Sequence, residues 1–190
     1  MAPLPTTLDQ IQQAVQRGRR FKYLFFWGHK PRSDGRIGKA CLSQWYTAPF
    51  SVDGYLYLTA EHFMMAEKAR LFGDEDMRQR IITAPHPGAA KKLGRQVRGF
   101  DDPTWQDARF DIVVRGNQAK FEQNKALGEF LRRTNRRVLV EASPRDRIWG
   151  IGFAADDTRA SSLRSWRGAN LLGFALMEAR SALPGDWALS

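Results

Sequence analysis

A helix-rich α+β fold in a single domain, with a small and mainly antiparallel sheet, is the structure that this sequence predicts. Apolar residues recur at helical spacing along most of the chain, whereas strand-like runs are few and short. A chain of 190 residues is long enough to bury one hydrophobic core, and no linker, repeat or low-complexity tract divides it. We therefore expect one domain over residues 1–190, in which residues 1–20 form an N-terminal helical extension.

The first elements are predicted to be a helix, a strand and a loop. Leu8, Ile11 and Val15 follow helical spacing behind a capping box at Thr7 and Gln10, which predicts an amphipathic helix. The aromatic run 23–27 predicts a buried strand closed by Gly28. Residues 29–39 are polar and contain glycine, as is typical of a loop.

A β-hairpin and a capped helix are predicted next. Residues 49–52 and 55–58 flank Asp53-Gly54, and this pair of turn residues tolerates the positive φ angles of a tight hairpin. Thr59 is placed to cap a helix over 60–72, which Gly73 ends.

The second half of the chain reads mainly as helices. A short helix is expected over 74–83, and proline at a first helical position indicates two further starts, at His86-Pro87 and at Asp102-Pro103. The latter helix is expected to reach Gly116, and helical patterning resumes over 120–133. A strand over 138–141 and a final helix over 170–183 complete the expectation.

The composition limits the classes of function. The formal net charge of +10 favours anionic partners such as nucleotides or nucleic acid, although solvated helix faces explain it equally well. The basic groups 91–98 and 132–137 are open to the same two interpretations. A single cysteine, Cys41, excludes an intrachain disulfide, and no paired His or Cys spacing indicates a metal. The sequence starts without a signal-peptide pattern and holds no membrane-spanning apolar run, so we expect a cytoplasmic protein.

The helix over 60–72 carries charges on its apolar side. Glu61 and Lys68 are seven residues apart, about 10 Å along one stripe, with Met65 between them. The dipole of the helix is expected to hold a first-turn carboxylate ionised, which suits a base or a cation stabiliser. The alternative is an ordinary solvated acid and base at the edge of the stripe. His62 points elsewhere and is expected to be a packing residue.

The segment 141–153 follows a predicted strand and mixes charged residues, glycines and a tryptophan. Such a loop brings backbone close to a ligand, and Trp149 is suited to stacking on a planar base. A core position for Trp149 is the alternative, since large aromatic side chains usually pack.

Taken in order, the motifs of this chain resemble those of the NADAR (YbiA-like) family. They are FFWGH, CLSQWY, VDG, TAEHFMMAEKARLFGD, GRQVRGFD, GNQAKFEQN, LVEASPRDRIWGIG and GANLLGFALMEAR, and they run from about residue 23 to about residue 180. The resemblance implies a single YbiA-like domain that hydrolyses N-glycosidic bonds. In two respects the chain departs from the riboflavin-type members: Ile151 stands where they often carry an acid, and the loop over 29–39 is longer.

The resemblance also implies functional residues and substrates. It assigns catalysis to Glu61, Lys68 and Asp146, and substrate binding to Trp45, Trp149, Gly150 and Asn170. Two substrates are implied, phosphoribosylamino-pyrimidine intermediates of riboflavin biosynthesis and ADP-ribosylated guanine, the latter free or in nucleic acid.

Breaking a ribose–nitrogen bond needs a carboxylate near C1′ and a proton donor near the base. Glu61 is predicted to stabilise the ribose cation or activate water, while Asp146 orients a ribose hydroxyl. Lys68 is a proton donor, a phosphate ligand or a Schiff-base amine. No metal and no cofactor are expected. The alternative function is a non-catalytic module that binds ADP-ribose or nucleic acid.

Overall fold

Helices dominate the structure. The computed structural model describes residues 4–184, so residues 1–3 of the predicted extension and residues 185–190 lie outside it. Its elements are, in order, α1 (Leu8–Gln16), β1 (Tyr23–Phe26), η1 (Lys39–Leu42), β2 (Phe50–Val52), β3 (Tyr55–Tyr57), α2 (Ala60–Leu71), α3 (Glu75–Ile82), α4 (Pro87–Gly94), α5 (Asp102–Gln123), α6 (Lys125–Arg133), β4 (Val138–Glu141), η2 (Thr158–Ser161), η3 (Leu163–Ser165) and α7 (Leu171–Ala182). The predicted helix-rich α+β class is confirmed.

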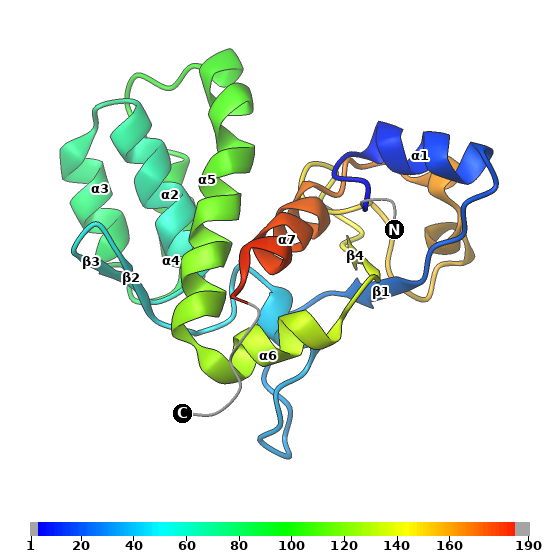
Figure 1. Cartoon of the computed structure of the whole chain (residues 1–190). Helices are drawn as coiled ribbons and strands as arrows, with labels where there is room; N and C mark the ends of the chain where they lie inside the picture. Colours follow the sequence, from blue (N-terminus) through cyan, green and yellow to red (C-terminus); the bar gives the residue numbers. More distant parts are fainter. Residues whose placement is uncertain (1–3, 185–190) are drawn as a thin grey trace.

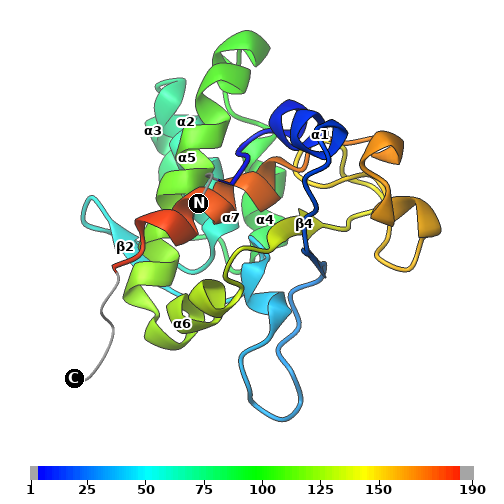
Figure 2. The ribbon, with the colours of Figure 1, turned by 45° about the vertical axis from the view of Figure 1, so that its right-hand side comes forward.

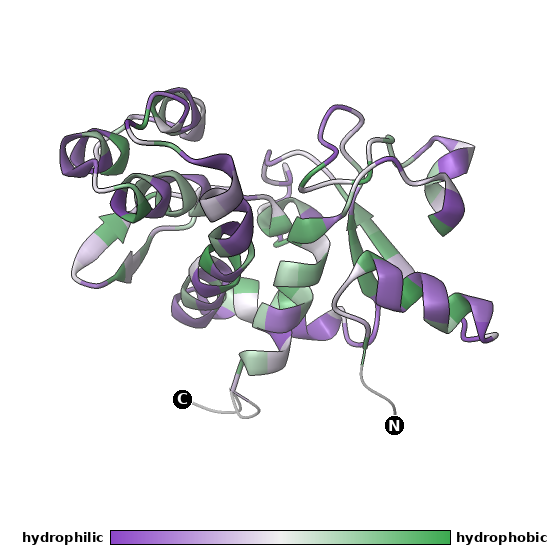
Figure 3. Cartoon of the chain, turned by 90° about the horizontal axis from the view of Figure 1, so that it is seen from above, coloured by the Kyte–Doolittle hydropathy of each residue, from purple (hydrophilic) through white to green (hydrophobic). Residues whose placement is uncertain are grey.

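Helix α7 lies at the centre of the molecule, between α5 on one side and β4 on the other (Figure 1, Figure 2). Helices α2, α3 and α4 and the β2–β3 hairpin lie on the α5 side, whereas β1 and α1 lie on the β4 side. Most residues of α7 are buried. Seen from above, α7 is mostly green, whereas the outer helices carry purple faces (Figure 3). The hydrophobic core therefore surrounds α7.

Within residues 4–184, the four strands form two separate pairs. Strand β1 pairs in parallel with β4, with Tyr23 opposite Val138 and Phe26 opposite Glu141. Strands β2 and β3 form the antiparallel hairpin predicted around Asp53-Gly54. The sequence analysis expected one mainly antiparallel sheet. That expectation is wrong, because there are two separate sheets and one of them is parallel. Parallel strands that are far apart in sequence pair only when the helices between them pack against the sheet. A local pattern of apolar residues does not predict such a pairing.

Helix α5 is longer than predicted, because it continues through Gly116 to Gln123. A Cβ atom at position 116 would lie 2.5 Å from Cδ1 of Phe63 on α2. Gly116 is therefore required for close helix packing, and does not end the helix. The break comes at Asn124, the residue between α5 and α6.

Two further expectations concern single features. His62 is fully buried, and its ring nitrogens contact Thr59 Oγ1 at 2.8 Å and the Ala84 carbonyl oxygen at 3.0 Å, as expected for a packing residue. Within residues 4–184, no helix has the length and apolar character needed to cross a bilayer.

Candidate active site

A pocket of about 1010 Å³ opens where β1 and β4 end. Both strands run toward it, because Trp27 follows β1 and Glu141 ends β4, and both residues line the pocket. Ligands of parallel sheets commonly bind beyond the carboxyl ends of the strands. The rest of the wall comes from loop 28–38, which projects from the body of the molecule, from η1 and the residues that follow it, from helix α4 and from segment 143–146 (Figure 1, Figure 2).

Three carboxyl groups gather at this pocket. Glu141 and Asp146 line it; Glu61 is buried and is not among the lining residues, but it lies close enough to influence Glu141 electrostatically. The negative charge of Asp146 raises the pKa values of both Glu61 and Glu141. The three acids therefore form one interacting cluster, in which Glu61 and Glu141 hold a proton more tightly than isolated carboxyl groups do.

Glu61 is buried in the first turn of α2, with only 2% of its surface exposed. Burial raises its pKa to about 7, against the opposing effects of Lys91 and of a hydrogen bond from the Trp45 side chain. Its Oε1 atom is buried and has no hydrogen-bond partner among the described residues. Desolvation therefore opposes the helix dipole that was expected to hold Glu61 ionised, and with a pKa of about 7 the group is only partly ionised at neutral pH.

Glu141 is the acid that the sequence analysis did not single out. Burial, together with the charges of Asp146 and Glu61, raises its pKa to about 8. Its Oε2 atom is also buried without a hydrogen-bond partner among residues 4–184. The available signal was a glutamate that ends an otherwise apolar strand, since such a side chain stands at the edge of a sheet.

Asp146 shapes the loop that follows β4. Its Oδ1 accepts hydrogen bonds from the backbone N–H groups of Ile148, at 2.9 Å, and Trp149, at 2.8 Å. The carboxyl group therefore holds a tight turn as well as facing the pocket. Trp149 is partly buried against the hydrophobic core and is not among the pocket-lining residues, so its predicted stacking on a base stays a prediction.

Gly150 and Asn170 hold Glu141 in place. A Cβ atom at Gly150 would lie 2.8 Å from the Glu141 carbonyl oxygen. The Asn170 side chain accepts a hydrogen bond from Glu141 N–H at 2.9 Å and donates one to the Leu139 carbonyl at 2.9 Å. Neither residue is among those that line the pocket, and their predicted substrate contacts stay predictions.

Lys68 lies away from this pocket. Its Nζ donates a hydrogen bond to the Gly94 carbonyl at 3.0 Å, and it lies 4.0 Å from the centre of the Phe100 ring. Burial lowers its pKa. The ammonium group thus sits at the C-terminal end of α4, where a cation stabilises the helix dipole. Glu61 and Lys68 do not meet at one ligand here, and the catalytic role of Lys68 stays a prediction.

Six cationic side chains line the same pocket as Glu141 and Asp146. They are Lys30, Arg32, Lys39, Lys91, Arg95 and Arg145. Arg32 is paired with Asp34 at 2.6 Å. Lys91 and Arg95 belong to the basic group 91–98 of the sequence, which is thus divided, since Arg98 pairs with Asp74 on another face. The pocket is therefore lined by both acidic and basic side chains.

Two tryptophans belong to the pocket. Trp45 lines it, as its predicted binding role requires, with its ring 5.6 Å from that of His29. Trp27 also lines it and is 60% exposed, although the sequence predicted a place at the end of a buried strand. The strand ends one residue earlier, at Phe26. Trp27 is therefore the exposed aromatic surface of this site.

Buried polar contacts fix the segment that carries Trp45. Lys120 is fully buried on α5 and donates to the carbonyls of Cys41, at 2.7 Å, and Ser43, at 2.9 Å. The Gln44 carbonyl accepts a hydrogen bond from Glu61 N–H at 3.0 Å. Helices α5 and α2 thus hold Trp45 beside Glu61. In the described part of the chain, no group of three His, Cys, Asp or Glu side chains is placed to bind a metal ion.

Comparison with known proteins identifies the family. A model of the NADAR domain matches residues 25–184. The chain belongs to the NADAR family. The segment that carries Trp27, η1, the acid cluster and α7 falls entirely within the NADAR match.

Named relatives of this NADAR chain agree with its predicted reaction class. It is 40% identical over 166 residues to N-glycosidase R617 of Acanthamoeba polyphaga mimivirus, which covers 84% of the chain and 95% of that protein. It is 31% identical over 141 residues to N-glycosidase YbiA of Shigella flexneri serotype 5b, covering 74% of the chain and 79% of the relative. The prediction of a hydrolase of N-glycosyl bonds is thereby confirmed.

A solved structure supports the fold of this NADAR domain. The NMR structure of the E. coli protein YbiA superposes with a TM-score of 0.66 at 27% sequence identity. The match covers 94% of this chain and 92% of the other. The predicted YbiA-like fold is confirmed.

Proposed function

We propose that the chain hydrolyses the ribose–nitrogen bond of a nucleotide-like substrate that carries two phosphates, of which ADP-ribosylated guanine is the candidate. The observation that carries the proposal is a pocket lined by Glu141, Asp146 and six cations, with the buried Glu61 close enough to raise the pKa of Glu141. The cations would bind phosphates, and the acids would lie where the reacting bond enters.

The acid cluster supplies both groups that the reaction needs. Glu141 has the higher pKa, about 8, and keeps its proton at neutral pH, so it would donate that proton to the departing nitrogen. Glu61 has a pKa of about 7 and ionises more readily; its carboxylate would stabilise positive charge at C1′ and take a proton from the attacking water. The C1′–N bond breaks, a C1′–O bond forms, and both protons are accounted for.

The shape of the pocket favours the larger of the two expected substrates. A volume of about 1010 Å³ is at the upper end for small-molecule sites, and six cations exceed what one phosphate engages. A phosphoribosylamino-pyrimidine has a single phosphate. The exposed face of Trp27 would stack on a planar base.

The test is incubation with ADP-ribosylated guanine and, separately, with a phosphoribosylamino-uracil, with mass detection of released base and sugar. We expect release of guanine and ADP-ribose, unchanged after dialysis against EDTA. Faster cleavage of the pyrimidine would overturn the choice of substrate. Binding of ADP-ribose without turnover of either compound would favour a non-catalytic module.

A further inference from the structure

A second, strongly basic pocket lies at the opposite end of the parallel strand pair. It has a volume of about 420 Å³ and is lined by residues that precede β1 and β4. Six of its lining residues are cationic: Arg19, Arg20, Lys22, Arg133, Arg136 and Arg137. None of the lining residues is acidic. This pocket uses the basic group 132–137 of the sequence, for which the proposed reaction has no role.

The two basic pockets are separate sites. Lys22 precedes β1 and Trp27 follows it, so the four residues of β1 lie between the two pockets, and extended chain from Lys22 to Trp27 spans about 17 Å. Residues 133–137 and 141–146 are separated by β4 in the same way. Substitutions that change the charge of residues at the amino ends of the strands therefore should not displace the acid cluster.

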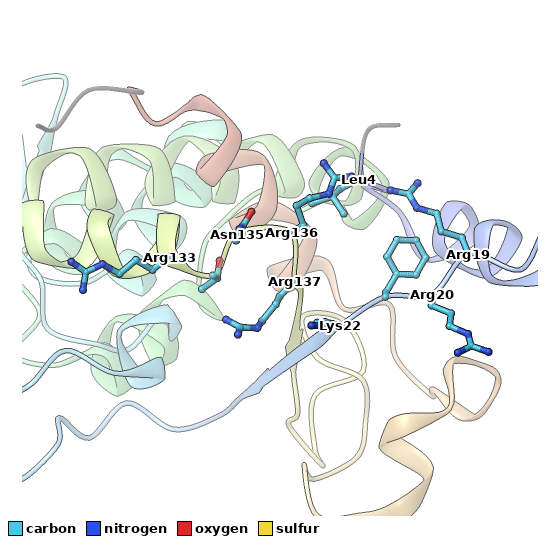
Figure 4. Close-up of a pocket in the computed structure, with 10 residues that line it drawn as sticks. Leu4, Arg19, Arg20, Lys22, Arg133, Asn135, Arg136 and Arg137 are labelled. Atoms are coloured by element: carbon cyan, nitrogen blue, oxygen red, sulfur yellow. The ribbon is translucent and has the colours of Figure 1, made fainter. Parts of the chain in front are cut away.

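The cations spread along the surface and do not converge on one point. In Figure 4 the side chains of Arg133, Arg137 and Arg20 point away in different directions, and they come from α6, from the turn before β4 and from the segment before β1. One phosphate cannot engage all of them. A regular series of phosphates can, because each strand of a nucleic-acid duplex presents one charge about every 3.4 Å of its axis.

A buried arginine, Arg180, adds positive charge next to this pocket. The Arg180 side chain is buried on α7 and donates to Thr134 Oγ1 at 2.7 Å and to the Arg137 carbonyl at 3.1 Å. Burial lowers its pKa to about 10, so the group is still charged at neutral pH. Arg133 pairs with Glu129 at 3.6 Å, and no acidic residue of the described chain lines the pocket itself. The net field remains strongly positive.

We propose that this second pocket, at the amino ends of β1 and β4, binds the phosphodiester backbone of a nucleic acid without sequence preference. Arginine is well suited to this partner, because its planar guanidinium donates two parallel hydrogen bonds to phosphate oxygens. The site does not depend on the proposed reaction. It would tether the protein to a polynucleotide while the acid cluster stays accessible.

The test measures binding of a fluorescent 20-nucleotide single strand and its duplex across a salt series. Arg20→Glu and Arg137→Glu are made separately, and Arg80→Glu on α3 is the matched control, since all three residues are exposed and each change alters the net charge equally. We expect each pocket variant to bind about tenfold more weakly and to lower the salt slope by about one, uniformly across sequences. Arg80→Glu should change affinity less than twofold.

The outcomes separate this site from the reaction. Cleavage of a small substrate should be unchanged in both pocket variants, so failure of the catalytic proposal would not affect the binding result. Equal affinities in all three variants would overturn the proposal. Binding to phosphatidylserine vesicles in place of both oligonucleotides would overturn it as well.

Discussion

The protonation of Glu61 depends on its burial more than on its position in a helix. A first-turn carboxylate on a solvated helix would be ionised at neutral pH, whereas enclosure raises the Glu61 pKa to about 7. Sequence reasoning identified this residue as a candidate, because an acid on an apolar helix face is unusual. It could not predict the protonation state, which depends on Trp45, Lys91 and Asp146 from other elements.

Glu61→Gln should stabilise the fold at alkaline pH. The folded-state pKa of about 7 lies above the usual 4.5. Protonated Glu61 therefore contributes its full share to the free energy of unfolding below pH 4.5, and this contribution is lost as pH rises through 7. Glutamine does not titrate. In urea unfolding the variant should match the wild type near pH 5 and exceed it at pH 8, by about 3 kcal/mol at most.

Glu75→Gln is the control for this comparison. The pKa of Glu75 is lowered by hydrogen bonds from Gln79 and Arg78, so removing its charge should give no gain at pH 8. A Glu61→Gln variant that is less stable than the wild type at pH 8 would show that its carboxylate is the favoured form in the folded protein.

Trp27→Ala should weaken substrate binding. Stacking of a base on an aromatic side chain contributes about 1–3 kcal/mol, so KM should rise roughly tenfold while kcat changes little. Leu56→Ala, a comparably exposed apolar residue on β3, is the control and should leave both constants unchanged. An unaltered KM in the Trp27 variant would exclude stacking at this position.

At the scale of elements, local patterns predicted where helices and strands occur but not how they pair. The caps at Thr7 and Thr59 and the Asp53-Gly54 turn involve near neighbours in sequence, and all three are present. The parallel β1–β4 pair joins distant segments. It brings Glu141 to the acid cluster, which is why the sequence did not identify this residue.

Asn170→Gly tests how α7 positions the end of β4. Asn170 has a φ of 54°, which glycine adopts readily, so the change removes the two side-chain hydrogen bonds but keeps the backbone conformation. We expect a loss of about 1–3 kcal/mol in the free energy of unfolding, together with reduced turnover, because Glu141 loses an anchor.

Asn135→Gly is a matched control for that variant. Asn135 has nearly the same φ, 53°, but it is exposed after α6. Its replacement should be neutral in both unfolding and turnover. If Asn170→Gly behaves in the same way as Asn135→Gly, the side chain of Asn170 does not hold Glu141.

At the scale of the whole molecule, whose net charge is +10, two pockets at opposite ends of one strand pair are each lined by six cations. The sequence predicted anionic partners and the two clusters 91–98 and 132–137. It could not show that Lys91 and Arg95 face the acid cluster whereas 133–137 face away, because this depends on the direction of β4. Lys68 also shows what spacing along a helix cannot predict. It lies on the same helix as Glu61, but its ammonium group binds the Gly94 carbonyl at the end of α4.

The six cations that line the pocket predict that catalysis depends on salt concentration. If the six cations attract a phosphate-bearing substrate, kcat/KM should fall several-fold as ionic strength rises from about 0.01 to 0.15 M, since the Debye length shortens from about 30 to 8 Å. An analogue without phosphates should be cleaved poorly and without this dependence. Equal processing of both compounds at all salt concentrations would exclude steering.

The account depends most directly on Glu61 as a catalytic residue, and single-turnover kinetics of Glu61→Gln measure this. On a substrate that the wild type cleaves, the variant should be slower by on the order of a hundredfold or more, because one positioned charged group contributes that much to such a transition state. Glu122→Gln, at an exposed position on α5, should keep full activity. Near-wild-type turnover by Glu61→Gln would show that the acid cluster is structural and that catalysis occurs elsewhere.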